Sequence, residues 1–439
     1  MLICGAARAE INPELPIELT GYGPGRLATR VHDDLHVAAL YLEDRAGDAA
    51  GERLAVLTYD MAHTGKRFIA EVQKRCAAAT GLPERSILTT SSHAHSSPTV
   101  RPDRVPEGAD AKRRHDAWRA RVVERSVEAL KAALDSAQPA TVSCNATRIR
   151  ENVNRRVFLP DGTYFYQPKH KYLSPVADGP VDDELGMLYF RAAHDGKTIA
   201  TVVNYTAHPL TVGDSSDEVT ADYPGVLKRE IERNWGGTAL FITGAAGDNH
   251  PQGAEAGFAR CERMGLALAE KVLYHRWDAV RLDDPPVASV WRDIVLPAMT
   301  DEDFARVPKD YGSEKRLTVP DDAKAEGGLA VSLCLWSIGP VLFIGTPGEL
   351  VAELGLRLKW ESPFPKTYVM YLATEHLGYM AHRNAFAWGG YEAVCTRFGP
   401  EAGARFCDAA LSAAKELKTR VEATGRRVAL PGGIRGKED

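Results

Sequence analysis

The chain has 439 residues, of which 44% are hydrophobic and 26% charged, an ordinary globular composition that can bury a large core. Its formal net charge of −5 gives no electrostatic basis for binding nucleic acid. The seven cysteines are scattered and never form a C-x-x-C pair, which favours reduced thiols over a disulfide framework or a structural zinc cluster. No run of about eighteen apolar residues predicts a membrane span, and no signal peptide is expected, so we expect a cytoplasmic protein.

Apolar, β-branched runs alternate with segments of helical periodicity along the chain. We expect strands at His36–Leu42, Leu54–Tyr59, Ala140–Cys144, Thr198–Tyr205, Thr238–Ile242, Val331–Trp336 and Pro340–Ile344. We expect helices at Lys66–Ala79, Asp116–Ser136, Val226–Asn234, Ala256–His275, Glu349–Lys359 and Ala402–Thr424. This alternation predicts an α/β fold of mixed β-sheets covered by helices. No linker divides the chain, so residues 1–439 are expected to form a single large domain.

Polar residues gather where five of the expected strands end. The five stretches are Val56–His63, Thr89–Pro98, Val202–Pro209, Phe241–Pro251 and Phe343–Glu349. Ligands of α/β sheets bind outside the carboxyl ends of strands, so we expect these stretches to converge on one site. Taken singly, each has a structural explanation: Asp248 fits a helix N-cap, and Glu349 fits a first-turn acid favoured by the helix dipole.

The tripeptide that contains His93 and His95 follows an apolar run and lies among serines and threonines. Residues i and i+2 of a strand share a face, so both rings are expected to reach one ion or one substrate. The alternative is a pair of exposed histidines in a serine-rich turn. With His208 and Glu349, His93 completes the ligand set of catalytic zinc, which leaves one position open for water. Zinc lowers the pKa of that water towards ~7 and polarises a carbonyl oxygen.

The order of these motifs resembles the N-terminal catalytic domain of the neutral/alkaline, non-lysosomal ceramidase family. The matching stretches are Gly5–Ile11, Leu19–Gly23, Ile87–Pro98, Asn152–Arg156, Ala207–His208, Gly244–Pro251, Pro347–Glu349, Gly378–Tyr379 and Tyr391–Glu392. The H-x-H-S-x-P block and the two tyrosines, which lie twelve residues apart as in the family, are the most specific of them.

The resemblance implies that His93, His208, Glu349 and Tyr379 bind one zinc ion. It implies that His95 lies beside the metal and touches the substrate instead of binding zinc.

The same resemblance assigns roles around the reacting carbonyl. Arg155 is suited to holding a carbonyl or carboxylate oxygen, and Tyr391 to donating a hydrogen bond to the oxyanion. Asn154, in the motif of Arg155, and Asp60, at the first strand end, are expected to contact the substrate.

One position departs from the family pattern. His250 stands where the family has its nucleophilic serine, and an imidazole cannot repeat the attack of that serine on an amide. Three explanations are open: a zinc-activated water replaces the serine, His250 and Asp248 serve a second metal ion, or ceramidase activity is absent. We favour water, because the zinc ligands are retained. Asp248 and His250 are therefore counted among the catalytic candidates.

The expected function is zinc-dependent hydrolysis of a small polar amide or ester, an amide being favoured. Secreted ceramidases carry a C-terminal immunoglobulin-like domain, which we do not expect here, and no lipid-facing segment stands out for long-chain ceramide. The alternatives are action on a carbohydrate or polyol, for which Trp388 and Tyr391 offer aromatic surface, ceramidase-like N-acyl hydrolysis, and binding without catalysis. The expected partner is a small molecule, and self-association into a homo-oligomer is compatible with the sequence.

Overall fold

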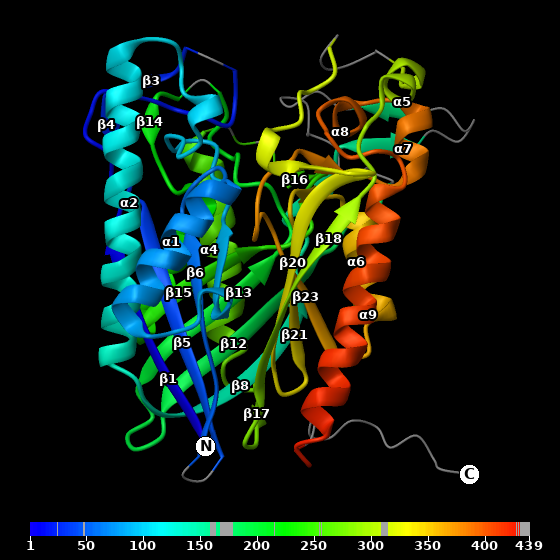
Figure 1. Ribbon diagram of the computed structural model, residues 1–439. Helices are drawn as coiled ribbons and strands as arrows, with labels where there is room; N and C mark the ends of the chain where they lie inside the picture. The colour runs from blue at the N-terminus through cyan, green and yellow to red at the C-terminus, as the bar shows by residue number, and fades with distance from the viewer. Residues whose placement is uncertain are drawn as a thin grey trace, which may run out of the picture.

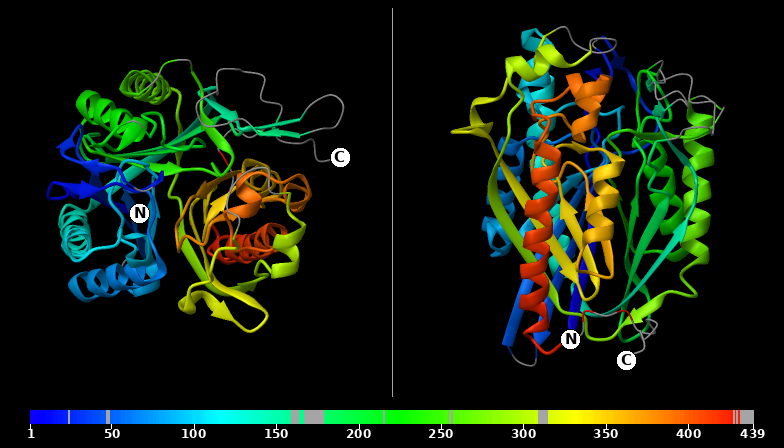
Figure 2. Two further views of the ribbon diagram at one scale, coloured as in Figure 1. Left: turned by 90° about the horizontal axis from the view of Figure 1, so that it is seen from above. Right: turned by 90° about the vertical axis from the view of Figure 1, so that its right-hand side faces the viewer.

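The computed structural model describes residues 1–23, 25–46, 49–158, 164–166, 179–214, 216–253, 255, 257–308, 315–426, 428 and 430. Two mixed β-sheets lie face to face, and helices cover the outer side of each sheet (Figures 1 and 2). The predicted α/β class, with helix-covered mixed sheets, is confirmed. None of the described helices has the length and apolarity needed to cross a membrane.

The first sheet combines antiparallel pairs with two parallel pairs at its ends. In spatial order its strands are β15 (Thr238–Thr243), β13 (Thr198–Tyr205), β12 (Glu184–Ala192), β8 (Gln138–Arg148), β1 (Leu2–Glu10), β5 (His36–Ala46), β6 (Ala49–Tyr59) and β7 (Ile87–Ser91), with β17 (Val280–Leu282) beside β8. The parallel pairs are β13 with β15 and β6 with β7. In each parallel pair the carboxyl ends of the two strands therefore lie next to each other at the same edge of the sheet.

The second sheet is formed by the later part of the chain. Its strands are β18 (Val287–Leu296), β20 (Gly328–Ile338), β21 (Val341–Gly345) and β23 (Lys366–Met370), with β19 (Lys324–Ala325) beside β20. Short two-stranded pairs connect the loops: β2 (Ile17–Glu18) with β3 (Leu27–Ala28), β4 (Arg30–Val31) with β14 (Glu218–Val219), β9 (Asn152–Asn154) with β16 (Asn249–Pro251), β10 (Arg156–Phe158) with β11 (Tyr164–Tyr166), and β22 (Glu349–Leu350) with β24 (Tyr379–Met380).

The helices bury their apolar faces against the outer sides of the sheets. They are α1 (Lys66–Thr80), α2 (Ala109–Asp135), α3 (Asp222–Trp235), α4 (Phe258–Tyr274), α5 (Asp301–Arg306), α6 (Ala352–Glu361), α7 (Arg383–Trp388), α8 (Tyr391–Val394) and α9 (Ala402–Glu422). α1 to α4 cover the first sheet, and α6 and α9 cover the second (Figure 2, left). The core between the sheets includes Trp336 and Phe343, whose rings stack at 4.3 Å.

All of the strands and helices expected from the sequence are present, with shifted ends. The largest shift is in α2, which begins at Ala109 instead of Asp116. The helix expected from Glu349 begins at Ala352, and Glu349 itself belongs to β22. The interpretation of Glu349 as a first-turn acid is therefore wrong.

The polar strand ends converge where the two sheets meet. The Thr243 hydroxyl, at the end of β15, donates to the Ser92 carbonyl just beyond β7 at 2.7 Å. The Tyr371 amide, just beyond β23, donates to the Thr243 carbonyl at 3.0 Å. The Thr90 hydroxyl donates to the Tyr371 carbonyl at 2.5 Å, so the ends of β7, β15 and β23 are each bonded to the other two. Loops from both sheets are thus fixed to one another.

Asp60 lies apart from this convergence, although it also follows a strand end. Both of its carboxylate oxygens accept from Lys228 Nζ at 2.6 Å, and Oδ2 also accepts from the His36 amide at 2.9 Å. Both side chains are more than nine-tenths buried. Asp60 therefore ties α3 to the first sheet, and the structure does not bring it to the other candidate site residues.

We predict that Lys228→Met destabilises the fold, because it leaves the Asp60 carboxylate buried without its cation. Removing one member of a buried ion pair typically costs about 3–5 kcal/mol. The double variant Asp60→Asn/Lys228→Met should regain much of this loss. The measurement is urea unfolding of the three proteins. Equal stability of Lys228→Met and wild type would contradict the structural role of the pair.

Candidate metal centre and active site

The core of the site is one carboxylate oxygen that faces two imidazole rings. Glu349 Oε2 lies 3.3 Å from His93 Nε2 and 3.2 Å from His208 Nε2. The three side chains are buried, and they come from three different strand ends. Burial raises the pKa of the Glu349 carboxyl, but the surrounding histidines outweigh it and hold that pKa well below its usual range. The Glu349 side chain is therefore an anion.

Both histidines are oriented by backbone carbonyls. His93 Nδ1 lies against the Ala62 carbonyl, and His208 Nδ1 lies 2.5 Å from the Ala246 carbonyl. A carbonyl oxygen only accepts, so each Nδ1 carries the proton and each Nε2 of a neutral ring offers its lone pair towards Glu349. This is the arrangement in which proteins hold metal-binding histidines.

This donor set fits a divalent cation. Burial lowers the pKa of His208 to about 4, so its ring is neutral near pH 7. The lone pair of Nε2 then faces the lone pairs of a carboxylate oxygen, which is repulsive unless a positive charge lies between them. Two imidazoles and a carboxylate are also the ligands that zinc prefers.

Tyr379 lies next to Glu349 because β22 and β24 are paired in parallel. Glu349 and Tyr379 are register partners in this pair. Burial raises the pKa of the Tyr379 phenol well above its usual range, and Glu349 raises it further, so the group is a neutral phenol. Tyr379 is therefore a neighbour of Glu349 in the paired strands.

The backbone around His93 explains why the two histidines of the H-x-H motif meet. His93 and His95 follow β7 instead of lying on it, and His93 has a φ of +70°. The expectation that strand alternation aligns their rings is therefore wrong. A left-handed residue other than glycine costs about 1–3 kcal/mol and is typical of functional sites.

His95 reaches the same centre. Its Nε2 lies 3.1 Å from His93 Nε2, and the ring contacts Tyr22 at 4.9 Å between centroids. His93, His95 and His208 together form a group of buried nitrogens that could hold a metal ion. Gly21, with a φ of +102°, lets the loop pass His95, since a Cβ there would lie 2.6 Å from His95 Cα.

Two residues that hold Glu349 were missed by sequence reasoning. The Tyr371 hydroxyl donates to Glu349 Oε2 at 3.1 Å, and His376 Nε2 lies 2.8 Å from Glu349 Oε1. Arg101 Nη1 lies 3.1 Å from His376 Nδ1, and a guanidinium only donates, so the His376 proton is on Nε2 and is donated to Glu349. The only sequence signal was their position just before Gly378-Tyr379.

Arg155 lies beside Tyr379 and Tyr391 and is fixed by several groups. Its guanidinium contacts the buried Glu392 carboxylate and donates to the Gly247 carbonyl at 2.9 Å. It lies 5.4 Å from the ring centres of both Tyr379 and Tyr391. Glu392 also binds Arg156, so one carboxylate holds two buried guanidiniums.

His250 contacts this arginine. Arg155 Nη1 donates to His250 Nε2 at 2.8 Å, and the His250 ring lies 4.9 Å from that of His208. Since Nε2 accepts from Arg155, it cannot at the same time bind a metal or take a proton. In this arrangement His250 positions Arg155 beside the metal ligands.

Asp248 and Asn154 form a structural network. Asp248 Oδ1 accepts from the Ala352 amide, the first of α6, at 2.8 Å, and Oδ2 accepts from Asn154 Nδ2 at 2.9 Å. Asp248 therefore caps the N-terminus of α6 from outside that helix. Asn154 also donates to the Pro180 carbonyl and accepts from the Arg156 amide, both at 2.8 Å. These contacts leave Asn154 little capacity to bind a substrate.

Two imidazoles and a carboxylate form a donor set of the kind with which metal-dependent hydrolases hold catalytic zinc. The family model of neutral/alkaline non-lysosomal ceramidase, N-terminal, matches residues 3–261. The chain belongs to this family, which indicates a hydrolase that acts on amide bonds.

Solved structures agree with the family assignment at the level of the fold. The crystal structure of neutral ceramidase from Pseudomonas aeruginosa is 17% identical, with a TM-score of 0.74, over 95% of this chain and 75% of that chain. A ceramidase complexed with C2 is also 17% identical over the same shares, with a TM-score of 0.75. No curated protein matches the chain by sequence.

We predict that His376→Gln lowers the affinity for Zn²⁺ by about 10- to 100-fold, the usual effect of losing a residue that orients a metal ligand. The matched control is His63→Gln, because the His63 ring lies 5.0 Å from that of His376 and has no contact with Glu349 among the described residues. Competition with a chromophoric chelator measures both affinities. Equal Zn²⁺ affinity in the two variants would remove His376 from this role.

Proposed function

We propose that this protein is a zinc-dependent hydrolase of a small polar amide or ester, an amide being favoured, with water as the nucleophile. The proposal rests chiefly on the two imidazole nitrogens that lie 3.2–3.3 Å from one carboxylate oxygen. Family membership supports amide bond cleavage. The histidine at position 250 supports water, since the chain has no serine there.

A zinc ion held by His93, His208, Glu349 and Tyr379 would supply a Lewis acid and lower the pKa of its water towards ~7. His95 is suited to contacting the substrate beside the metal, because its Nε2 lies 3.1 Å from His93 Nε2.

Arg155 and Tyr391 are suited to stabilising the oxyanion. Burial raises the pKa of the Tyr391 phenol above its usual range, so its hydroxyl stays protonated near pH 7. Arg155 is held rigidly by Glu392 and Gly247 and needs no reorganisation when negative charge develops.

The surroundings of the site favour a polar substrate. The cavity that reaches His376 has a volume of about 780 Å³, and nine of the eighteen residues that line it are Lys, Arg, Asp or Glu. A long alkyl chain would have to desolvate these charges on binding, which is costly. This argues for a small polar compound over a long-chain ceramide.

The first test is the metal content of the purified protein and its hydrolysis of acyl amides, acyl esters and glycosides. We expect about one zinc ion per chain, and chelation should abolish amide hydrolysis. His208→Ala should lose the metal and the activity together, whereas the exposed His194→Ala should keep both. Full metal content in His208→Ala, or cleavage of glycosides with no cleavage of amides, would overturn the proposal.

We predict that His250→Ala lowers kcat by about 10²-fold or more, the scale typical of weakened charge stabilisation, because Arg155 loses the acceptor that positions it. His250→Gln should recover part of this loss, because its amide oxygen can accept the hydrogen bond from Arg155. Metal content should remain at the wild-type level in both variants. A kcat of His250→Ala close to that of the wild type would reduce His250 to a turn residue.

A further inference from the structure

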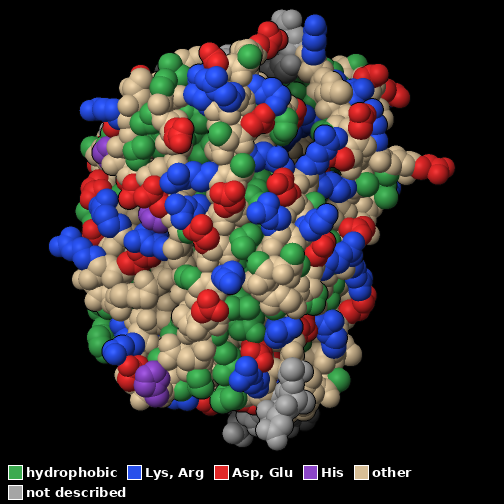
Figure 3. Space-filling model, turned by 60° about the vertical axis from the view of Figure 1, so that its left-hand side comes forward, with side chains coloured by type: hydrophobic (Ala, Val, Ile, Leu, Met, Phe, Trp, Pro, Cys, Tyr) green, Lys and Arg blue, Asp and Glu red, His purple; other side chains and the backbone are tan. Residues whose placement is uncertain are grey.

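A basic pocket lies directly beside the metal ligands. It is lined by six cationic and three acidic residues: Lys66, Arg67, Arg101, Arg104, Arg119 and Arg397, against Asp103, Asp322 and Glu375. On the molecular face drawn in Figure 3, basic and acidic side chains are interspersed. The pocket therefore concentrates positive charge.

Most of the pocket's charges are paired within the protein. Both carboxylate oxygens of Asp103 accept from Arg101, at 2.6 and 3.1 Å, and Asp322 accepts from Arg67 at 3.1 Å. Burial raises the pKa of Glu375 to about 8, so this carboxyl is largely protonated at pH 7. None of these acids is available to the remaining arginines.

Arg397, Arg104 and Lys66 form no ion pair with a carboxylate among the described residues, and Lys66 instead donates to the carbonyls of Asp322 and Ala330. The Arg397 side chain is 93% buried, since only 7% of it is exposed; its Nε donates to the Thr318 carbonyl at 2.6 Å, and its Nη1 has no partner. Burial, together with Arg101 and Arg104, lowers the pKa of Arg397 to about 10, which still leaves it charged at pH 7.

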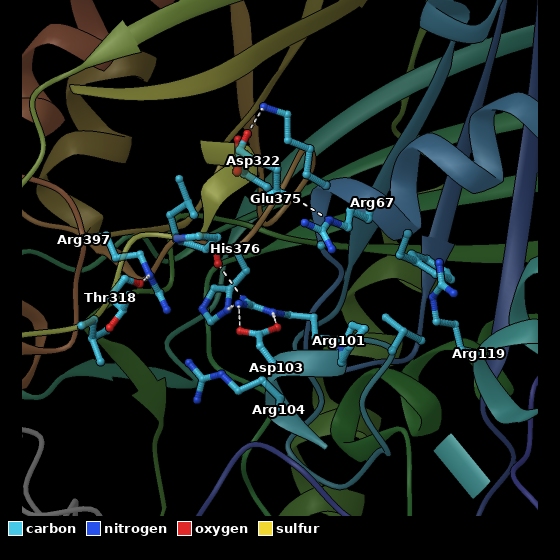
Figure 4. A pocket seen from close by; sticks show the side chains of 18 residues that line it. Arg67, Arg101, Asp103, Arg104, Arg119, Thr318, Asp322, Glu375, His376 and Arg397 are labelled. Carbon is cyan, nitrogen blue, oxygen red and sulfur yellow. Dashed lines mark hydrogen bonds and ion pairs between the residues drawn. The ribbon is translucent and has the colours of Figure 1, made fainter. Parts of the chain in front are cut away.

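The guanidiniums of Arg397, Arg104 and Arg101 converge around His376 (Figure 4). A buried guanidinium nitrogen without a partner is costly, and crowding by like charges adds to that cost. An anion with several oxygens would satisfy the free donor and offset the repulsion, and the planar fork of arginine matches a carboxylate or phosphate.

We propose that this pocket binds a carboxylate or phosphate group. The substrate is the favoured source of that group, because His376 joins the pocket to the catalytic centre: one of its nitrogens faces Arg101 and the other faces Glu349. This part rests on the proposed function and narrows the substrate class to amides that carry an anionic group. A free anion that occupies the same pocket is the other source of the same chemistry.

The first experiment is a calorimetric titration of the metal-loaded protein with inorganic phosphate and with acetate, at low ionic strength so that charges are weakly screened. We expect Arg397→Met to weaken binding by about tenfold or more, the usual effect of losing a charge-assisted hydrogen bond. Arg104→Ala, a substitution at an exposed position that should not disturb folding, should weaken it as well. The matched control Arg67→Ala lines the same pocket, but Arg67 is paired with Asp322, so this variant should weaken binding much less than Arg397→Met.

The second experiment identifies the source of the anion. It compares the hydrolysis of N-acetylglycine with that of its neutral amide, N-acetylglycinamide, and of N-acetyl phosphoethanolamine with that of N-acetylethanolamine. A lower KM for the anionic member of a pair, with the difference lost in Arg397→Met, assigns the pocket to the substrate. Arg397-dependent phosphate binding without this preference assigns it to a free anion.

The two proposals can fail separately. If no amide is cleaved, the proposed function fails, and the titration still decides whether the pocket binds anions. If phosphate and acetate bind no more tightly to the wild type than to Arg397→Met and Arg104→Ala, and neutral and anionic amides are cleaved alike, the pocket proposal is overturned.

Discussion

The whole site depends on one electrostatic problem: the Glu349 carboxylate is buried against imidazole nitrogens, and the ring of His208 among them is neutral. A buried anion requires donors, and Tyr371 and His376 provide two of them. The Nε2 lone pairs of His93 and His208 face the same carboxylate. A cation between them would be attracted to the carboxylate and to both imidazole nitrogens. The two sheets, the strand ends and the loop that carries His93 at positive φ all serve to bring these groups to one point.

Sequence patterns predicted the scaffold well because its elements are long and strongly periodic. The helix-covered sheets and the convergence of polar strand ends follow from apolar runs that stop abruptly at histidine, asparagine or glutamate. Shorter features were harder to predict. Glu349 stands in a two-residue strand ahead of α6, and no periodicity can distinguish such a strand from a first helical turn. The left-handed conformation of His93 likewise has no signature in residue type.

The residues around the ligands were the least predictable part of the site. Tyr371, His376 and Glu392 act through contacts with residues far away in the chain, as when Glu392 binds Arg155. Asp60 and Asn154 are the opposite case: their positions suggested contacts with a substrate. In the structure Asp60 instead accepts from a lysine, and Asn154 donates to a carboxylate. Only the fold shows which polar groups are already satisfied within the protein.

The candidate metal ligands come from segments of two different sheets, and this has a mechanical consequence. His93 and His208 follow strands of the first sheet, whereas Glu349 and Tyr379 belong to segments that follow strands of the second. An ion held by all four residues would cross-link the two sheets, and its binding free energy would oppose the sliding of one sheet over the other. The distances between the metal-binding side chains would then depend on how the two sheets are packed against each other. A small displacement of one sheet relative to the other would therefore abolish catalysis before either sheet unfolds.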